Sequence, residues 1–319
     1  MTDYETLRRP IMISCTGRSG STMFYRLLAQ HKDLGWLSTY NERFPSQHWL
    51  AMFSRLYAKR PFRKFRDNYY FPKPFSPYTF WEQLLPNIAR HDRPLTADDV
   101  PDEAIEPVRR TIHRILRYQG KQRFLMKVTG WGRMAYFNRI FPDMQFIFLR
   151  RDPLAVIESW VRVGWLNVTS SVDSDDWEWG PVPEGYRALW EELGGGPLLS
   201  AAVKTQLDID DICANMRQFP GRCFEIHYED LIANPVESMR KVLDYCNLEW
   251  DARFEEVVKS KVLHNYTRRW TETISESDAS RVQAFFERAA AMQHESSAPT
   301  ASGPDTENVG QSSRSLASR

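Results

Sequence analysis

The chain has 319 residues, 42% of them hydrophobic, which is enough to bury a sizeable core in one large domain or two small ones. Its 42 basic and 41 acidic residues leave a formal net charge of +1, which excludes the broad positive field that favours non-specific nucleic-acid binding. No segment approaches the roughly 18 consecutive apolar residues of a spanning helix, and the four cysteines are spaced neither as a zinc site nor as a disulfide framework. We therefore expect a cytoplasmic protein with reduced cysteines and no membrane span, with a peripheral membrane contact left open.

The first elements are predicted to be a strand, a tight turn and a helix. The apolar run Ile11–Cys15 has the length of a buried strand. A helix is expected from about Met23 to Leu28, because apolar residues recur there every three or four positions. The turn between them is rich in glycine and hydroxyl side chains, and it reads Gly17-Arg18-Ser19-Gly20-Ser21-Thr22.

This turn has the properties of an anion-binding loop. Glycines let backbone N–H groups converge on an anion, and the start of the following helix adds a partial positive charge. Arg18 supplies a planar cation, and Ser21 and Thr22 supply hydroxyl donors. The loop lacks the lysine of the ATP-binding pattern G-x-x-x-x-G-K-[ST]. A glycine- and serine-rich turn without a ligand is the alternative.

Strands and helices alternate along the rest of the chain. Residues 36–85 are rich in aromatic residues, Pro and Arg, and predict irregular or short-helical structure. Helices are predicted over 101–120, 131–143, 154–163 and 234–248, and strands over 123–130, 145–153 and 222–231. Such alternation favours an α/β fold with a mostly parallel sheet.

A second candidate anion site lies in the middle of the chain. Arg151 ends an apolar strand, at the edge where open α/β sheets place their ligands. Ser159 lies eight residues later in a helix that begins at Pro153. Arg151 and Ser159 could together hold a separate phosphate, and an Arg151 paired with Asp152 is the alternative. Lys127, at the end of another strand, would face the same crevice unless it is simply solvated.

In this order, the two motifs resemble those of the sulfotransferases that use 3'-phosphoadenosine 5'-phosphosulfate (PAPS). The stretch "GRSGST" is similar to the 5'-phosphosulfate loop of that family. The stretch "RRDPLAVIESW" is similar to its 3'-phosphate motif, and "HYEDLIANP" resembles its Tyr-Glu-Asp-Leu segment. The arginine in the loop resembles the carbohydrate and tyrosylprotein branches, and the similarity spans roughly residues 10–270.

The resemblance implies a P-loop NTPase-like parallel sheet with helices on both faces, and PAPS as the donor without a metal. Residues 17–22 would hold the 5' end of the donor, with Arg18 balancing charge, and Arg151 and Ser159 would hold the 3'-phosphate. Lys127 would contact the donor or the transferring group. Tyr228 would either join the donor site or close the end of the late strand.

A base must remove the proton of the acceptor. In the branches that the loop resembles, a Glu shortly after the first helix has this role, which implies Glu42. It is the only acidic residue between positions 33 and 67. A pair with Arg43 or with another arginine of the same basic stretch is the alternative role of Glu42. His31 and His48 are competing candidates for the base, and His113 and Asp33 are weaker ones.

The acceptor is expected to be a hydroxyl or amine of a carbohydrate, a lipid or a small molecule. Residues 165–197 are acidic and punctuated by Gly and Pro, which predicts an acceptor lid or a solvated loop packed on the body. The basic and aromatic residues 55–75 could instead meet an anionic acceptor or a lipid surface. Aromatic residues that could contact the acceptor from the lid are Trp165, Trp177, Trp179, Tyr186 and Trp190. Trp131 or Trp270 could stack on adenine.

One domain is expected over residues 1–292, followed by a disordered tail over 293–319, where the composition turns to small and polar residues. Two other functions stay open. One is a P-loop kinase or nucleotide-binding protein, which would prefer ATP to adenosine 3',5'-bisphosphate. The other is a non-catalytic protein of the sulfotransferase fold that binds a partner.

Overall fold

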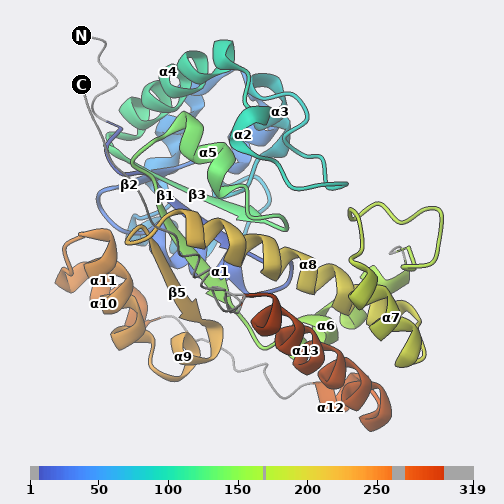
Figure 1. Cartoon of the computed structure of the whole chain (residues 1–319). Coiled ribbons are helices and arrows are strands. Elements are labelled where there is room, and N and C mark those ends of the chain that lie inside the picture. The colour runs from blue at the N-terminus through green and yellow to red at the C-terminus, as the bar shows by residue number, and fades with distance from the viewer. Residues whose placement is uncertain (1–6, 168–169, 261–269, 298–319) are drawn as a thin grey trace, which may run out of the picture.

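A computed structural model describes residues 7–167, 170–260 and 270–297 of the chain. Its centre is a five-stranded, all-parallel sheet with the strand order β2-β3-β1-β4-β5 (Figure 1). The strands are β1 (Ile11–Cys15), β2 (Leu34–Trp36), β3 (Arg123–Thr129), β4 (Gln145–Arg150) and β5 (Cys223–His227). The predicted α/β fold with a parallel sheet is confirmed.

Helices cover both faces of the sheet, as the resemblance implied. Alternate residues of β1 point to opposite faces, so Ile11 and Ile13 belong to one buried cluster and Met12 to another. The first cluster packs under α1 (Ser21–Leu28) and α10 (Pro235–Cys246). The second packs under α4 (Asp102–Gln119) and α5 (Met134–Ile140). Burial on both faces explains why the strands read as almost continuous apolar runs.

Local sequence signals explain where the main helices begin and end. Pro153 occupies the first turn of α6 (Pro153–Arg162), and the side chain of Asp152 caps it by accepting a hydrogen bond from the Ala155 N–H at 3.1 Å. Gly120 ends α4 in the left-handed region, with φ of 64°. The predicted helix over 101–120 is therefore confirmed.

The segment from 36 to 85 is made of short helical pieces, as predicted. They are α2 (Thr39–Arg43), η2 (His48–Leu56), η3 (Arg60–Phe65) and α3 (Tyr78–Leu84). The predicted strand over 222–231 is shorter than expected, because the chain turns into α9 (Tyr228–Ala233) directly after β5. The remaining short elements are η4 (Ala97–Asp99), η5 (Trp165–Asn167), α11 (Ala252–Lys259) and α12 (Trp270–Thr273).

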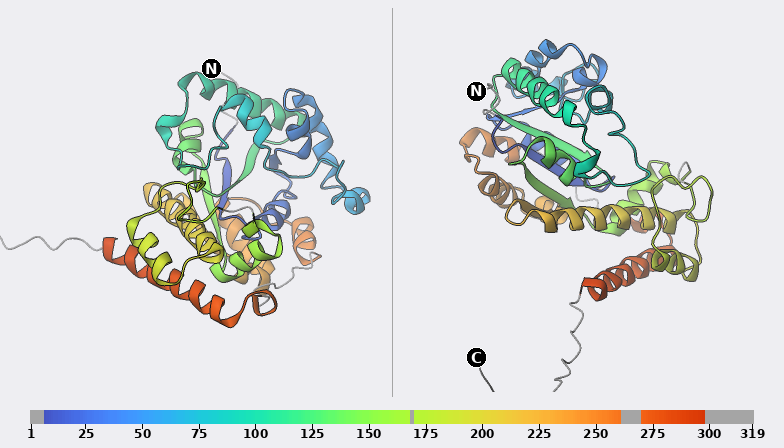
Figure 2. Two further views of the ribbon diagram at one scale, coloured as in Figure 1. Left: turned by 90° about the vertical axis from the view of Figure 1, so that its right-hand side faces the viewer. Right: turned by 45° about the horizontal axis from the view of Figure 1, so that its top comes forward.

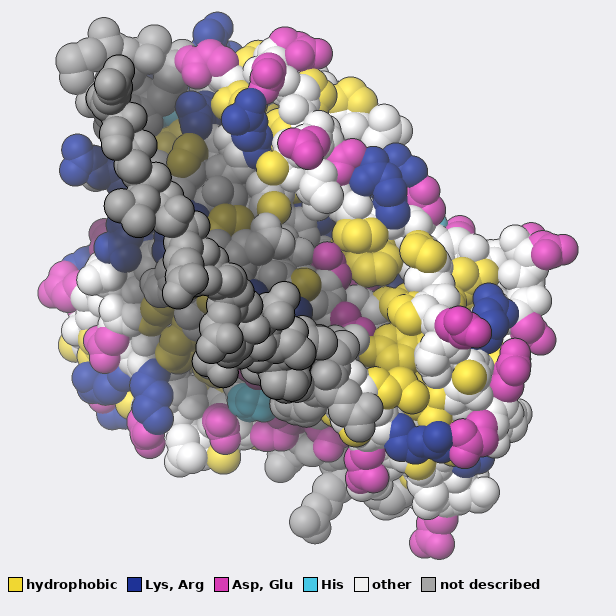
Figure 3. Space-filling view, in the orientation of Figure 1, with side chains coloured by type: hydrophobic (Ala, Val, Ile, Leu, Met, Phe, Trp, Pro, Cys, Tyr) yellow, Lys and Arg dark blue, Asp and Glu magenta, His cyan; other side chains and the backbone are white. Residues whose placement is uncertain are grey.

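A further group of helices packs beside the sheet (Figure 2). It joins α6 to α7 (Glu184–Glu192), α8 (Pro197–Gln218) and α13 (Glu276–Ser297) around a third hydrophobic cluster. Hydrophobic side chains also gather on the surface where α8 approaches α6 and α7 (Figure 3). The helix α13 runs on to Ser297, past the domain boundary expected at residue 292, and residues 298–319 lie outside the described part of the chain. None of the described helices combines the length and the hydropathy of a membrane-spanning helix.

Candidate active site

The loop after β1 is folded back on itself and packed against Tyr228. Arg18 and Gly20 adopt left-handed backbone angles, with φ of 63° and 82°. A Cβ atom at Gly20 would lie 2.3 Å from a ring carbon of Tyr228, so this position has no room for a side chain. The glycine thus lets the backbone of the loop lie directly against the start of α9, before α1 begins at Ser21.

The structure brings the two predicted phosphate motifs together. The Nε of Arg18 donates a hydrogen bond to Ser159 Oγ at 3.1 Å. The Nη1 of Arg151 donates to the backbone carbonyl of Arg18 at 2.9 Å. A third guanidinium group, that of Arg162, donates to the same Ser159 hydroxyl at 3.3 Å. Residues separated by more than 130 positions therefore form one cationic cluster at the carboxyl ends of β1 and β4.

This cluster has an excess of positive charge. Burial, followed by the neighbouring Arg162 and Arg151, lowers the pKa of Arg18, and only Glu158 opposes that shift. Burial also lowers the pKa of Arg151, a residue that is 7% exposed. A bound anion would relieve the repulsion among these guanidinium groups.

Buried donors in the cluster also fit an anionic ligand. Among the described residues, Arg151 Nε, Arg151 Nη2 and Ser19 Oγ are buried without a hydrogen-bond partner. A buried polar group left in this state costs about 1–3 kcal/mol. Phosphate oxygens would satisfy these donors, so the residues present fit a phosphorylated ligand.

The contacts of its neighbours leave the Arg151 guanidinium group available for an anionic ligand. Asp152 caps α6 through Ala155, as described above, and the Arg151 guanidinium lies over the Tyr228 ring at 4.7 Å. The alternative of an Arg151–Asp152 pair is therefore wrong. The Tyr228 ring packs against both Gly20 and the Arg151 guanidinium group, and these contacts hold the loop and Arg151 in position. Arg150, the preceding cation, pairs with Glu225 at 3.3 Å.

Lys127 lies at the same rim of the sheet, which is formed by the carboxyl ends of β1, β3 and β4, as expected. Its ammonium group donates a hydrogen bond to Thr22 Oγ1 at 3.2 Å, which joins the end of β3 to the first turn of α1. Burial lowers the pKa of Lys127. Ser76 donates to the Lys127 carbonyl at 3.0 Å, so the segment before α3 also reaches this rim.

Glu42 lies on α2, where its contacts are with the start of α3. Its carboxylate accepts hydrogen bonds from Thr79 Oγ1 at 2.7 Å and from the Thr79 N–H at 3.1 Å. Arg43 instead stacks on the Tyr69 ring at 3.8 Å, so the alternative of a Glu42–Arg43 pair is wrong. A role for Glu42 as the base stays a prediction.

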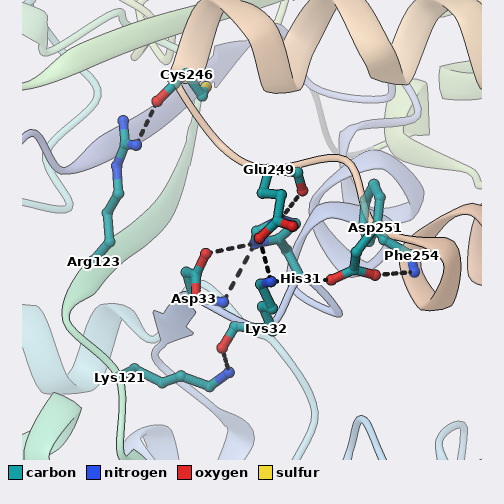
Figure 4. A network of polar contacts seen from close by, with 9 residues as sticks. All are labelled: His31, Lys32, Asp33, Lys121, Arg123, Cys246, Glu249, Asp251 and Phe254. Atoms are coloured by element: carbon teal, nitrogen blue, oxygen red, sulfur yellow. Dashed lines mark hydrogen bonds and ion pairs between the residues drawn. The ribbon is translucent and has the colours of Figure 1, made fainter.

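Of the histidines considered as bases, His31 lies away from the loop. His31 is 1% exposed, and its Nε2 contacts the Glu249 carbonyl at 2.9 Å in a polar network beyond the end of α1 (Figure 4). That network lies at the opposite end of α1 from the loop, so it removes His31 from the rim. Asp33 lies in the turn after α1, where its N–H donates to His31 Nδ1. His48 begins η2 and packs edge-on against Phe80.

A cavity of about 400 Å³ opens beside the loop. It is lined by Gly17, Thr129, Gly130, Trp160, Trp165, Glu178, Trp179 and Lys204. Trp165 and Trp179 of the predicted lid therefore face it. Tyr186 and Trp190 do not, because they are buried with α7, α8 and α13, and their predicted contact with the acceptor is wrong. The indole of Trp177 donates to the Gly180 carbonyl at 2.7 Å.

Of the two candidates for adenine stacking, the structure describes the side chain of Trp131. Trp131 is 6% exposed, and its indole N–H donates to the His91 carbonyl at 2.7 Å. Trp270 begins α12, but its side chain lies outside the described residues, as do the neighbouring residues 261–269.

One pair of charged residues near the cavity was not predicted. Lys204 and Asp208 on α8 are both buried and form an ion pair. Asp208 Oδ1 is buried without a partner in the described structure, and burial raises the pKa of this carboxyl. A Cβ at Gly130 would lie 3.8 Å from both Asp208 Oδ1 and Lys204 Nζ. Their spacing of four residues was the available signal, but α8 itself had not been predicted.

Comparison with known proteins gives one family. A protein-family model described as "Sulfotransferase family" matches residues 10–252. No curated protein matches the chain in sequence. The crystal structure of sulfotransferase STF9 from Mycobacterium avium is 14% identical, with a TM-score of 0.55 over 91% of this chain and 77% of that chain. Sulfotransferase STF1 from Mycobacterium tuberculosis H37Rv is 13% identical, with a TM-score of 0.53 over 91% of this chain and 79% of that chain. At these identities the structural likeness concerns the fold.

Proposed function

The chain belongs to the sulfotransferase family, and on this basis we propose that it transfers a sulfuryl group from PAPS to a hydroxyl or amine. The observation that carries the proposal is the contact between the loop and the second motif, through Arg18, Arg151 and Ser159. A donor with phosphate groups at both its 5' and 3' positions matches two adjoining cationic motifs at one edge of the sheet.

Each motif has its own part in holding the donor. Residues 17–22 bind the 5'-phosphosulfate through the backbone of the loop and the hydroxyls of Ser21 and Thr22. Arg151 and Ser159 bind the 3'-phosphate. Tyr228 holds Arg151 and the loop in place, as its ring contacts indicate.

The reaction is an in-line transfer. The acceptor oxygen or nitrogen attacks the sulfur and forms the new bond. The bond between sulfur and the bridging oxygen breaks, and 3'-phosphoadenosine 5'-phosphate (PAP) leaves with that electron pair. Glu42 takes the proton of the acceptor. Arg18 and Lys127 stabilise the negative charge that develops on the bridging oxygen and the leaving phosphate, because fixed cations in a partly buried site lower the barrier most.

The acceptor occupies the cavity beside the loop, and it is a carbohydrate, lipid or small molecule. Trp160, Trp165 and Trp179 give this cavity flat apolar walls, and Glu178 and Lys204 add one charge of each sign. Indole rings of this kind stack on sugar rings or enclose an apolar group. The Glu178 carboxylate and the Lys204 ammonium group can orient hydroxyl groups of the acceptor.

The test pairs two carboxamide variants. Glu42→Gln should lower turnover with PAPS by roughly 10²–10⁴-fold, the usual contribution of a general base. It should still gain thermal stability from PAP, because donor binding does not use this carboxylate. Asp208→Asn is the matched control, since it changes a buried carboxylate on α8 that lies beside Gly130 in the wall of the cavity.

The outcomes distinguish an error in the assignment of the base from an error in the proposed function. An active Glu42→Gln together with an inactive Asp208→Asn would assign the base to α8 and leave the donor site standing. Absence of both PAP stabilisation and transfer of radiolabelled sulfate from PAPS, over a panel of sugar, lipid and phenolic acceptors, would contradict the proposed function.

A further inference from the structure

One part of the surface carries most of the exposed large hydrophobic side chains. Eight of the eleven such side chains among the described residues lie between positions 44 and 75. They are Phe44, Trp49, Met52, Phe53, Phe65, Tyr69, Tyr70 and Phe75. Tyr69 and Tyr70 are 69% and 72% exposed. Clustered exposure of this kind marks an interaction site, whereas scattered exposed hydrophobic residues do not.

The same segment is strongly basic. Residues 43–81 hold eight of the chain's 42 basic residues and one of its 41 acidic residues, Asp67. The exposed cations include Lys59, Arg60, Arg63 and Lys64 on and before η3. Lys59 and Lys64 are both exposed, and the Lys64 ammonium group lies over the Phe65 ring at 5.1 Å. We call residues 43–75 the basic aromatic surface. Its charge contrasts with the near neutrality of the whole chain.

The basic aromatic surface is held in place from behind. Arg60 pairs with Glu256, and Arg63 donates to the Ser260 carbonyl at 3.3 Å, which fixes η3 to α11 and its end. On the outer side, Arg43 donates to the Tyr69 carbonyl at 3.0 Å and stacks on the Tyr69 ring. In Figure 2 this segment, in blue, projects from the edge of the molecule. Its exposed rings are therefore presented by an anchored scaffold.

An apolar groove of about 320 Å³ runs between these rings. Its lining is almost entirely aromatic and aliphatic, and consists of Tyr40, Phe53, Leu56, Phe62, Phe65, Asn68, Tyr70, Phe71 and Pro72. A groove with such walls suits hydrocarbon. The cations around it suit phosphate or carboxylate groups.

We propose that this chain docks onto an anionic lipid bilayer through the basic aromatic surface. Tyrosine and tryptophan prefer the boundary between headgroups and acyl chains, and Phe and Met gain from an apolar phase. Lys and Arg beside them are attracted by anionic headgroups. An acidic polysaccharide or a nucleic acid would match the charge but would offer no apolar phase to Phe44, Met52 and Phe65.

The basic aromatic surface continues into the candidate active site. Tyr25 of α1 contacts the Phe75 carbonyl at 3.5 Å, and the next residue, Ser76, donates to the Lys127 carbonyl. Docking would therefore place the membrane on the side of the molecule that carries residues 43–75. The chain passes from that side through Ser76 to its contact with Lys127 on β3. The proposal concerns binding alone and does not depend on the transfer reaction.

Sedimentation with vesicles tests the proposal on the full chain without donor. Vesicles of phosphatidylcholine with phosphatidylserine should bind the protein several-fold more than phosphatidylcholine alone, and added salt should weaken the binding. The double variant Lys59→Glu/Lys64→Glu should lose the preference for phosphatidylserine. The double variant Tyr69→Ser/Tyr70→Ser should bind more weakly at every salt concentration. Circular dichroism melting checks that both variants are folded.

A matched control separates the effect of the charge at the basic aromatic surface from the effect of the net charge of the protein. Arg187→Glu/Arg217→Glu makes the same change of net charge at two exposed positions on α7 and α8 and should keep vesicle binding. An equal loss in this control would overturn the proposal, as would a wild-type chain that ignores phosphatidylserine vesicles. Binding to heparin or single-stranded DNA, lost in Lys59→Glu/Lys64→Glu, with no vesicle binding would also overturn it and point to a polyanion.

Discussion

Ser159 shows how one small side chain can organise several cations. Its hydroxyl is 2% exposed and accepts hydrogen bonds from both Arg18 and Arg162. Arginines usually avoid such proximity, because like charges in a partly buried site raise the free energy of the folded state. Glu158, which pairs with Arg162 at 3.1 Å, offsets part of this repulsion, and a bound anion would offset more of it. The loop arginine, expected at the 5' end of the donor, therefore also reaches the residue expected at the 3' end.

Two glycines of the loop allow a matched test of its geometry. Gly20→Ala should destabilise the protein by about 1–3 kcal/mol, because it combines a left-handed φ with a clash against Tyr228. Gly17→Ala should change stability by less than about 1 kcal/mol. Its Cβ would meet Trp165 at an ordinary 3.5 Å. Urea denaturation measures both, and equal effects would mean that the loop does not lie against Tyr228.

Lys127 should make donor binding depend on alkaline pH. Burial lowers its pKa from the usual 10.5, and the phosphates of PAP would raise it again. Between the lowered pKa and the raised one, binding must take up a proton, so affinity should fall as pH rises through the lowered value. Calorimetry in two buffers with different ionisation enthalpies measures this uptake. Lys127→Met should abolish it, and an unchanged uptake would remove Lys127 from the donor site.

At the scale of elements, α8 explains most of what could not be predicted. Its residues from Leu199 to Ile209 are all buried, so no apolar stripe of helical period stands out in the sequence. Polar residues such as Lys204 and Asp208 occupy that buried stretch and further obscure the pattern. The cavity wall that α8 provides was therefore missed. β2 was missed for a simpler reason, because three residues are too few to show a period.

One carboxylate ties α8 to the loop after β3 and should leave a mark on the pH dependence of stability. Asp211 accepts a hydrogen bond from the Gly132 N–H at 2.6 Å, and burial raises its pKa from 3.8 to about 6. The folded state then binds this proton between pH 3.8 and 6, while the unfolded state does not. Its contribution to stability is thus fully present below pH 3.8 and is lost as pH rises through 6.

The variant Asp211→Asn removes that titration. The free energy of unfolding of Asp211→Asn minus that of the wild type should be more positive at pH 7 than at pH 4. Urea denaturation at both pH values measures this difference. Asp98→Asn, at an exposed carboxylate outside α8, should show no such trend. A constant difference between wild type and Asp211→Asn at both pH values would contradict a raised pKa.

At the scale of the whole molecule, parallel pairing explains why the sequence was informative. All five strands run in one direction, so the residues that follow β1, β3 and β4 meet at one edge. The strand assignment, together with the family resemblance, therefore led to the expectation that residues 17–22, Lys127 and Arg151 face one crevice. The positions of Glu42 and of residues 165–197 were harder to predict, because tertiary packing decides them and no period in the sequence reports it.

The decisive question is whether the two motifs grip two separate phosphates of one nucleotide. Calorimetric titration of the wild type and Arg151→Ala with PAP and with 5'-AMP, which lacks the 3'-phosphate, answers it. The wild type should bind PAP roughly 10–100-fold more tightly, as expected for charged hydrogen bonds worth about 1.5–3 kcal/mol. Arg151→Ala should lose that preference. Equal affinity of the wild type for both nucleotides, or a preference for PAP that survives in Arg151→Ala, would contradict a 3'-phosphate site at Arg151.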